Sequence, residues 1–220
     1  MTAWSYSRVN TFKQCPKKYY HLNVKKDVKD MGSAATRYGG RVHRAAEKYI
    51  KEGKPLDREY NFMQGTLDVL NKIEGEKHCE LRLGVAKDGE NFAATRFGAS
   101  DVWYRGIADL VIIDGDTAFS VDYKTSKNTN YADTKQLDLI AGALFINFPQ
   151  LKKIKSALSF VICKQFITKE HTSDLYKSYI NAFDEELERI EIALENNVWN
   201  PVDGPLCAFC PVTSCEHNRR

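Results

Sequence analysis

Two acidic residues near the middle of the chain, Asp109 and Asp122, are spaced so that a hairpin would bring them together. Asp109 lies in the apolar run 106–113, and Asp122 lies in the run 118–124, which ends at Lys124. The intervening Asp-Gly-Asp at 114–116 is a turn signal that predicts antiparallel pairing of the two runs. Side chains alternate faces along a strand, so Asp122 and Lys124 should point the same way.

This arrangement predicts a site for a hard divalent cation. Two close carboxylates repel one another unless a cation lies between them, and Mg²⁺ and Mn²⁺ prefer oxygen ligands. Such a metal activates water and neutralises charge on a phosphodiester. Lys124 would stabilise the same charge, and the carbonyl of Tyr123 offers a further oxygen ligand. The alternative is that Asp109 and Asp122 are ordinary strand-end acids; both runs are strongly apolar and suggest central strands, which favours the catalytic interpretation.

With their flanking residues, these motifs resemble the PD-(D/E)XK nuclease superfamily, in particular its RecB-type branch. The matching stretches are Gly-Ile-Ala-Asp at 106–109 and Val-Asp-Tyr-Lys-Thr-Ser at 121–126. Upstream, residues 39–47 resemble the branch's Gly-x-x-x-His helix, which implies that His43 is a metal ligand. Downstream, residues 136–140 resemble its glutamine-bearing helix, which implies a supporting role for Gln136, although Ile140 stands where many relatives have tyrosine. The motifs follow the family's order over residues 4–215.

The elements that must position these residues form an α/β pattern. We expect a mixed central sheet flanked by helices, which is the restriction-endonuclease-like fold that the resemblance implies. Glu80, at the start of the first strand, is a further polar candidate that ranks below the other site residues. The long last helix should bury one apolar face, formed by Phe183, Leu187, Ile190 and Leu194. The expected helices are 5–20, one around His43 that ends near 51, 62–76, 131–148 and 173–196, and the expected strands are 80–85, 101–104, 107–113, 119–124 and 155–163.

Six cysteines mark a second possible metal site. No apolar signal segment is apparent at the N-terminus, which predicts a reducing interior and argues against disulfides. Three cysteines cluster near the C-terminus in the spacing C-x₂-C-x₄-C, which is typical of metal sites. Zinc would take His217 as a fourth ligand, whereas an iron–sulfur cluster would take Cys15. The cysteines of this set are Cys15, Cys207, Cys210 and Cys215, while Cys79 and Cys163 are expected to be buried small hydrophobes.

The N-terminal segment favours the iron–sulfur interpretation. Residues 5–20 resemble the N-terminal motif of iron–sulfur members of the same branch, such as the CRISPR-associated adaptation nuclease and AddB. The resemblance implies that one N-terminal and three C-terminal cysteines hold a 4Fe–4S cluster joining the chain ends. Zn²⁺ stays an alternative because the C-terminal spacing is shorter than in many relatives. We therefore expect one nuclease domain, 1–220, with 1–35 and 198–220 forming a cysteine-cluster lobe.

Composition limits the kind of nucleic-acid binding that is expected. The chain of 220 residues is 43% hydrophobic and 28% charged, with a net charge of only +3, so it is not a generally basic DNA-coating protein. Its lysines instead gather in short runs that could hold phosphates or form solvated faces. Tyr19, Tyr20 and Tyr38 could stack on unpaired bases or pack in the core. The basic runs are 17–18, 25–26, 152–155 and 219–220.

These observations predict a metal-dependent deoxyribonuclease, most simply an exonuclease that acts on single-stranded DNA ends inside a bacterial, archaeal or host cell. The chain has no apolar run of membrane-spanning length. The resemblance implies roles in recombination, replication (possibly phage-encoded) or CRISPR adaptation, with partner proteins from those systems. Two alternatives belong to other classes. One is a DNA- or partner-binding module on a nuclease scaffold that needs a partner for activity, and the other is a zinc-stabilised structural protein.

Overall fold

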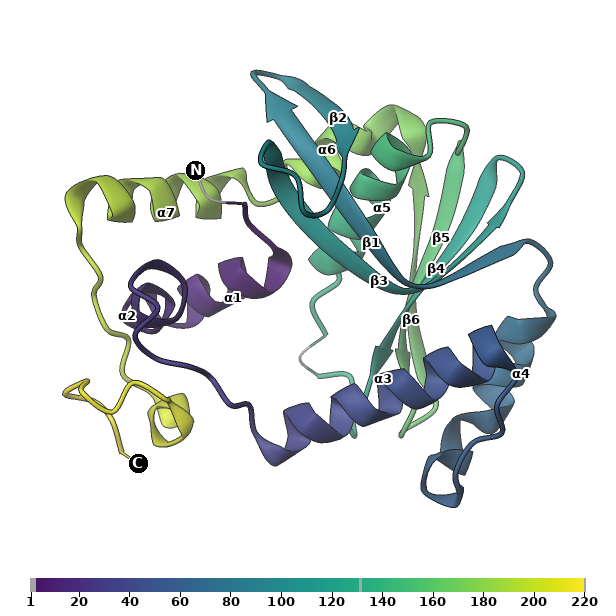
Figure 1. Cartoon of the computed structure of the whole chain (residues 1–220), viewed down its shortest axis with the longest axis horizontal. Helices are drawn as coiled ribbons and strands as arrows, with labels where there is room; N and C mark the ends of the chain where they lie inside the picture. Colours follow the sequence, from purple (N-terminus) through teal and green to yellow (C-terminus); the bar gives the residue numbers. More distant parts are fainter. Residues whose placement is uncertain (1–2, 131, 220) are drawn as a thin grey trace. The chain divides into compact units, whose positions relative to one another are not determined.

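The middle of the chain forms one six-stranded mixed sheet, seen in a computed structural model that describes residues 3–130 and 132–219 (Figure 1). The strand order is β2-β1-β3-β4-β5-β6, and all neighbours are antiparallel except the parallel pair β4 and β5. The predicted α/β class with a mixed, helix-flanked sheet is therefore confirmed. The strands are β1 (Glu76–Asp88), β2 (Asn91–Thr95), β3 (Val102–Asp114), β4 (Thr117–Lys124), β5 (Lys153–Phe160) and β6 (Gln165–Thr172).

The chain divides into two compact units. One combines the two chain ends, Met1–Gly32 and Phe183–Arg220, and the other is the middle, Ser33–Ala182. The sheet and its helices α3 (Ala34–Glu52), α4 (Gln64–Lys72), α5 (Lys135–Asn147) and α6 (Tyr176–Ile180) belong to the middle unit. The end unit contains α1 (Tyr6–Gln14), α2 (Pro16–Tyr19) and α7 (Asp184–Asn196). None of the described helices is both long enough and apolar enough to cross a bilayer.

The predicted hairpin between the two acidic strands is present. Asp114 pairs with Thr117, and Gly115 adopts the left-handed conformation (φ 58°) that a tight turn requires. The pairing of Leu110 with Val121 fixes the register, so Asp109 stands opposite Asp122. The sequence divided β3 into two strands, which was wrong. Gly106 continues the strand, and its missing side chain leaves room for Tyr104, whose hydroxyl would lie 2.8 Å from a Cβ there.

Helix α3 packs against the acidic hairpin through an apolar face. Its buried Val42, Ala46 and Ile50 join a core that includes Leu110 and Val121. Ser33 caps the N-terminus by accepting from Thr36 N, and Gly53 ends the helix with φ 65°. His43 was expected early in its helix, but α3 begins nine residues before it. The Gly39-Gly40 pair therefore lies inside the helix.

Helix α5 is buried almost all round. It begins at Lys135 rather than 131, and Tyr131, the expected start, lies outside the described residues. Gly142 permits α6 to approach closely, since a Cβ there would lie 3.1 Å from Ile180 N. This packing fixes the helix that carries Gln136.

Two predicted helices are interrupted, and each break has a local cause. Pro16 disfavours helical backbone in the preceding residue, so Cys15 is extended between α1 and α2. The expected last helix is divided into α6, which ends at Ile180, and α7, which begins at Asp184 directly after the buried Phe183. The acidic residues 184–186 suit the positive end of that new helix. Leu194, expected on the buried face, is 40% exposed.

Other boundaries also differ from the expectations. Strands β2 and β6 were missed because their exposed positions hide the apolar pattern. Strand β1 begins at Glu76 rather than Glu80, and β5 ends at Phe160 rather than Cys163. The expected helix 62–76 is a short 3-10 helix, Arg58–Met63, followed by α4.

Candidate active site

Asp109 is held at the centre of the candidate site by two contacts. Its Oδ2 accepts a hydrogen bond of 2.8 Å from Tyr123 N, and its Oδ1 lies 3.2 Å from His43 Nδ1. The first contact spans the β3–β4 pair and the second reaches α3. The motifs that are far apart in sequence, His43, Asp109 and Tyr123, therefore meet in one place.

His43 reaches this position because α3 approaches the end of β4 closely. A Cβ on Gly39 would lie 3.4 Å from Thr125 Oγ1, so the glycine allows tight packing there. His43 Nε2 lies 2.9 Å from the Tyr123 carbonyl oxygen, while Nδ1 faces Asp109. Burial opposes a charge on this ring, but the hydrogen bond to Asp109 and the nearby carboxylates together raise the pKa of His43 above its ordinary value. With acceptors at both nitrogens, the ring is stabilised as an imidazolium.

Glu80 completes a group of ligand atoms with His43 and Asp109. One atom from each of the three residues lies within 4.8 Å of the others. Glu80 stands where β1 loses its regular pairing opposite Asp109 and has a left-handed φ of 51°. Burial and then the charge of Asp109 raise the pKa of its carboxyl. The sequence ranked Glu80 below the other candidates, although an acid that interrupts an apolar strand is the signal that marks it.

Asp122, Lys124 and Gln136 form an adjoining group on the other side of the hairpin end. Lys124 Nζ lies 2.8 Å from Asp122 Oδ2 and donates 3.0 Å to Gln136 Oε1. The Gln136 amide in turn donates to Asp122 Oδ1. Gln136 is only 8% exposed, so it is a buried bridge rather than a surface residue. Burial raises the pKa of Asp122, more than Lys124 lowers it.

The donor set fits a hard divalent cation. Three carboxylates, those of Glu80, Asp109 and Asp122, have only two ion-pair partners among residues 3–130 and 132–219, which are His43 and Lys124. Asp122 Oδ2 is buried and, although near Lys124 Nζ, accepts no hydrogen bond of good geometry. Oxygen donors in excess of positive charge are the surroundings that Mg²⁺ and Mn²⁺ prefer. The backbone oxygen of Tyr123 lies beside His43, while the Tyr123 ring is buried in the core.

The end unit brings the four clustered cysteines to one cavity. The cavity has a volume of about 160 Å³, and its lining includes Cys15, Cys207, Cys210 and Cys215. The break before Pro16 makes Cys15 the N-cap of α2, and its sulfur accepts from the backbone N–H groups of Lys18 and Val202, both at 3.5 Å.

The spacing of these sulfurs bears on the kind of metal site. A tetrahedral zinc with bonds of about 2.3 Å places its sulfurs roughly 3.8 Å apart. Within residues 3–130 and 132–219, no three of the cysteine and His217 ligand atoms lie within 4.8 Å of one another. The remaining two cysteines, Cys79 and Cys163, are half-buried beside hydrophobic clusters; Cys163 lies in the turn after β5.

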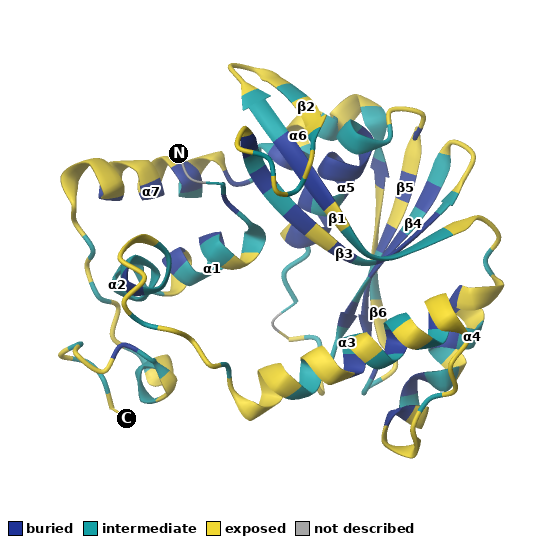
Figure 2. Cartoon of the chain, viewed as in Figure 1, coloured by how far each residue is buried: buried dark blue, intermediate teal, exposed yellow. Residues whose placement is uncertain are grey.

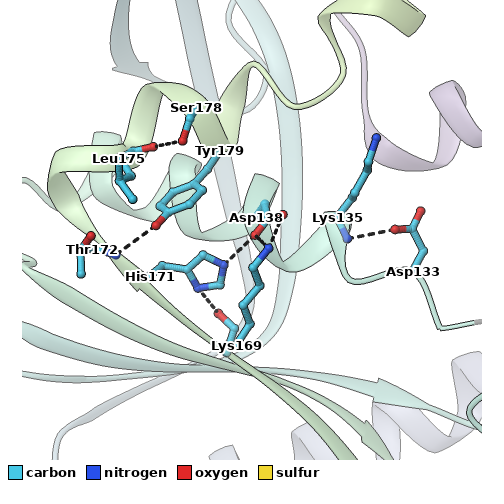
Figure 3. Close-up of polar contacts among 10 residues, drawn as sticks. Asp133, Lys135, Asp138, Lys169, His171, Thr172, Leu175, Ser178 and Tyr179 are labelled. Atoms are coloured by element: carbon cyan, nitrogen blue, oxygen red, sulfur yellow. Dashed lines mark hydrogen bonds and ion pairs between the residues drawn. The ribbon is translucent and has the colours of Figure 1, made fainter.

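A second charged network involves helix α5 and was not predicted (Figure 3). Asp138 receives His171 Nε2 at 2.9 Å and Lys169 Nζ at 2.7 Å, both from β6. His171 is fully buried, and its other nitrogen lies 3.4 Å from Ser156 Oγ on β5. Burial opposes the charge of Asp138, yet the hydrogen bonds from His171 and Lys169 lower the pKa of its carboxyl. In this network the negative charge is fully matched.

Comparisons with known proteins agree with the geometry. Among curated proteins, none is significantly similar in sequence to this chain. A solved structure named SSO0001 matches with a TM-score of 0.51 and 14% identity, covering 100% of this chain and 89% of that one. A second, described as a "Putative exonuclease" from Eubacterium rectale, matches with a TM-score of 0.52 and 16% identity, covering 99% of this chain and 88% of that one. At such identities these likenesses show the fold alone.

The family is shown by a match over nearly the whole chain. Residues 3–215 match the model of the PD-(D/E)XK nuclease superfamily. That span includes every residue of the two groups around Asp109 and Asp122. The chain therefore belongs to the PD-(D/E)XK nuclease superfamily.

Proposed function

We propose that this protein is an Mg²⁺- or Mn²⁺-dependent deoxyribonuclease that acts as an exonuclease on single-stranded DNA ends. The observation that carries the proposal is the group of His43, Glu80 and Asp109 ligand atoms within 4.8 Å, next to Asp122 and Lys124. The description of a structural neighbour as a putative exonuclease supports cleavage from DNA ends. The motifs at 39–47, 106–109 and 121–126 support the RecB-type branch.

His43, Asp109, Asp122 and the Tyr123 carbonyl are the proposed metal ligands, and the geometry adds Glu80. When bound, the cation would activate water and stabilise negative charge on the phosphate. Binding requires His43 to give up one proton and exchange a contact with Asp109 or Tyr123. Burial and the charge of Asp109 raise the pKa of Glu80, so its carboxylate is poorly stabilised by the protein alone and a bound cation would stabilise it.

Lys124 and Gln136 would orient the groups around the scissile phosphate. Lys124 can move its ammonium from Asp122 to a phosphate oxygen or to the attacking water, because Gln136 keeps one hydrogen bond to it. Gln136 holds Asp122 in a fixed orientation through its amide. We propose Gln136 as a positioning residue that also lies near the DNA.

We further propose that Cys15, Cys207, Cys210 and Cys215 hold a 4Fe–4S cluster. Support comes from the cavity that all four cysteines line and from the resemblance of residues 5–20 to the N-terminal motif of iron–sulfur relatives. The role would be structural, tying the two chain ends of one unit. Zinc held with His217 is the competing outcome, and iron, acid-labile sulfide and zinc analysis of anaerobically purified protein separates the two.

The cleavage test uses end-labelled linear and circular DNA, both single-stranded and duplex, with Mn²⁺, Mg²⁺ or chelator. The proposal expects metal-dependent loss of linear single strands, sparing of circles and no cleavage by Asp122→Ala. Cleavage of circular DNA, which has no ends, would show that the enzyme is an endonuclease rather than an exonuclease. Binding without cleavage under every metal would instead support a scaffold that requires a recombination, replication or CRISPR-adaptation partner.

A further inference from the structure

Strand β3 presents an exposed face that leads to Asp109. Along the first part of the strand, buried residues alternate with more accessible ones, and Figure 2 colours β3 accordingly. Arg105, Ile107 and Asp109 occupy the accessible positions, and residues i and i+2 of a strand share a face. Arg82 on β1 pairs with Ile107 across the ladder and so joins them. The buried positions are Val102, Tyr104, Gly106 and Ala108.

Gly84 allows an aromatic ring to be placed on this face. Gly84 pairs with Arg105 on one side and Thr95 on the other. A Cβ there would lie 2.4 Å from the Thr95 oxygen, so only glycine lets the chain after β2 fold across the strand. Phe97, the next aromatic, then contacts both guanidinium groups: its ring centre lies 5.6 Å from Arg82 Cζ and 5.7 Å from Arg105 Cζ. We name Arg82, Phe97, Arg105 and Ile107 the arginine surface.

The two guanidinium groups carry charge that nothing on this surface neutralises. Among residues 3–130 and 132–219, no carboxylate lies within ion-pair distance of Arg82 or Arg105. Arg105 Nε is buried without a hydrogen-bond partner in the described structure. Ile107, between them and the acidic site, is 46% exposed. The surface therefore offers unpaired cations and apolar contact area to a ligand.

The arginine surface is continuous with the candidate active site. At about 3.3 Å per residue, Ile107 and Arg105 lie roughly 7 and 13 Å along the strand from Asp109. On the neighbouring strand, Arg82 lies two residues along β1 from Glu80. A ligand lying on the surface would thus reach the metal group within a few nucleotide lengths.

We propose that the arginine surface binds the unpaired strand next to the scissile phosphate, an inference that rests on the proposed nuclease function. Guanidinium groups pair with phosphates, and a ring or aliphatic side chain between them can contact a base face. Base faces are exposed in a single strand and hidden in a duplex, so a surface that contacts base faces favours single-stranded DNA. Tyr19 and Tyr20 pack on Trp199, and Tyr38 packs beside the core.

The test measures binding of fluorescein-labelled oligothymidylate in chelator, by anisotropy at several salt concentrations. The double variant Arg82→Gln/Arg105→Gln should weaken binding at least about tenfold and lower the slope of log K against log salt by about 0.7 for each phosphate that is no longer bound. Phe97→Ala should weaken binding about tenfold with little change in slope. Arg82→Lys/Arg105→Lys retains the charges and should keep the slope, which separates the removal of positive charge from misfolding.

Arg58→Gln is the matched control, because Arg58 is an exposed arginine at the start of the 3-10 helix Arg58–Met63. If the double variant binds as tightly as this control, the arginine surface does not bind DNA. If the double variant loses as much affinity for a duplex as for a single strand, the proposed preference for single strands is contradicted. A second measurement compares cleavage of two substrates in Mn²⁺. The double substitution should lower kcat/KM for single-stranded DNA at least tenfold more than it lowers kcat/KM for bis(p-nitrophenyl) phosphate, which is too short to span the surface. If the wild type hydrolyses neither substrate, the proposed function fails, while the binding series still decides the surface.

Discussion

Helix α5 takes part in two acidic clusters through residues only two positions apart. Gln136 joins the cluster around Asp122, and Asp138 is the centre of the other. Taken together with the adjoining group of His43, Glu80 and Asp109, the cluster around Asp122 resembles the other one in that each contains at least one carboxylate, a histidine and a lysine. They differ in charge balance: the three carboxylates of the first cluster share two ion-pair partners, His43 and Lys124, whereas Asp138 alone receives both Lys169 and His171.

The pKa shifts express this difference. Burial raises the pKa of Asp122 and of Glu80, because the available cations do not compensate for it. Burial acts on Asp138 as well, but its two donors overcome it and the pKa falls. A carboxylate with a raised pKa beside others is poised to bind a cation, and one with a lowered pKa is already satisfied. The comparison therefore supports the proposed metal site around Asp109 and Asp122 and favours a structural role for the Asp138 network.

Removing Asp122 should give the largest effect on activity. We expect Asp122→Ala to lower kcat/KM for single-stranded DNA on the order of a thousandfold or more, since it removes a buried charge at the reacting phosphate. The free energy of unfolding should stay equal or rise, because Asp122 is a carboxylate whose ionisation burial opposes. Gel-based cleavage and denaturant unfolding of the same preparation measure both. A variant that unfolds more easily and still cleaves would reverse the assignment.

Glu80→Gln tests whether the group formed by His43, Glu80 and Asp109 is the metal site. Loss of one carboxylate should weaken Mn²⁺ binding about tenfold to hundredfold, with activity partly restored at high Mn²⁺. Isothermal titration calorimetry provides the affinity. Glu90→Gln, an exposed acid in the turn between β1 and β2, is the control for a general change in charge. Equal affinities for the two variants would remove Glu80 from the site.

Asp138→Asn should affect stability rather than cleavage. His171 is fully buried, so weakening its partner leaves a buried ring poorly matched, and we expect a loss of about 2 kcal/mol in the free energy of unfolding. Cleavage per folded molecule should fall far less than in Asp122→Ala. Urea unfolding and rates measured well below the transition provide the two numbers. A loss of cleavage as large as that of Asp122→Ala would mean that Asp138 acts on the reacting groups.

The local motifs were sufficient to predict the acidic hairpin and the mixed sheet, because the turn at 114–116 and two apolar runs are contiguous in sequence. The network of Asp138 was not predictable, since His171 lies on β6, whose burial pattern shows no apolar alternation. Glu80 was ranked low because its importance depends on its place across the sheet from Asp109, at an interruption of the β1–β3 pairing that the sequence does not reveal. The break at Cys15 follows from Pro16 and could have been predicted from that residue alone. Long-range pairing, rather than local propensity, accounts for most of what was missed.

The smallest expected effect is the pH dependence of the Asp138 network. The folded-state pKa of Asp138 lies below its ordinary value of about 3.9, so its stabilising contribution is fully present above that pH. As pH falls through the lower folded-state pKa, the carboxyl takes up a proton and the contribution disappears. The melting temperatures of wild type and Asp138→Asn should therefore differ by several degrees near pH 6, begin to approach one another only below about pH 4, and coincide once the pH is below the folded-state pKa of Asp138. Calorimetric scans of both proteins across this pH range measure the difference in melting temperature, to which the titration of groups common to both proteins does not contribute. A difference that widens on acidification would mean that Asp138 is not an ionised partner of Lys169 and His171.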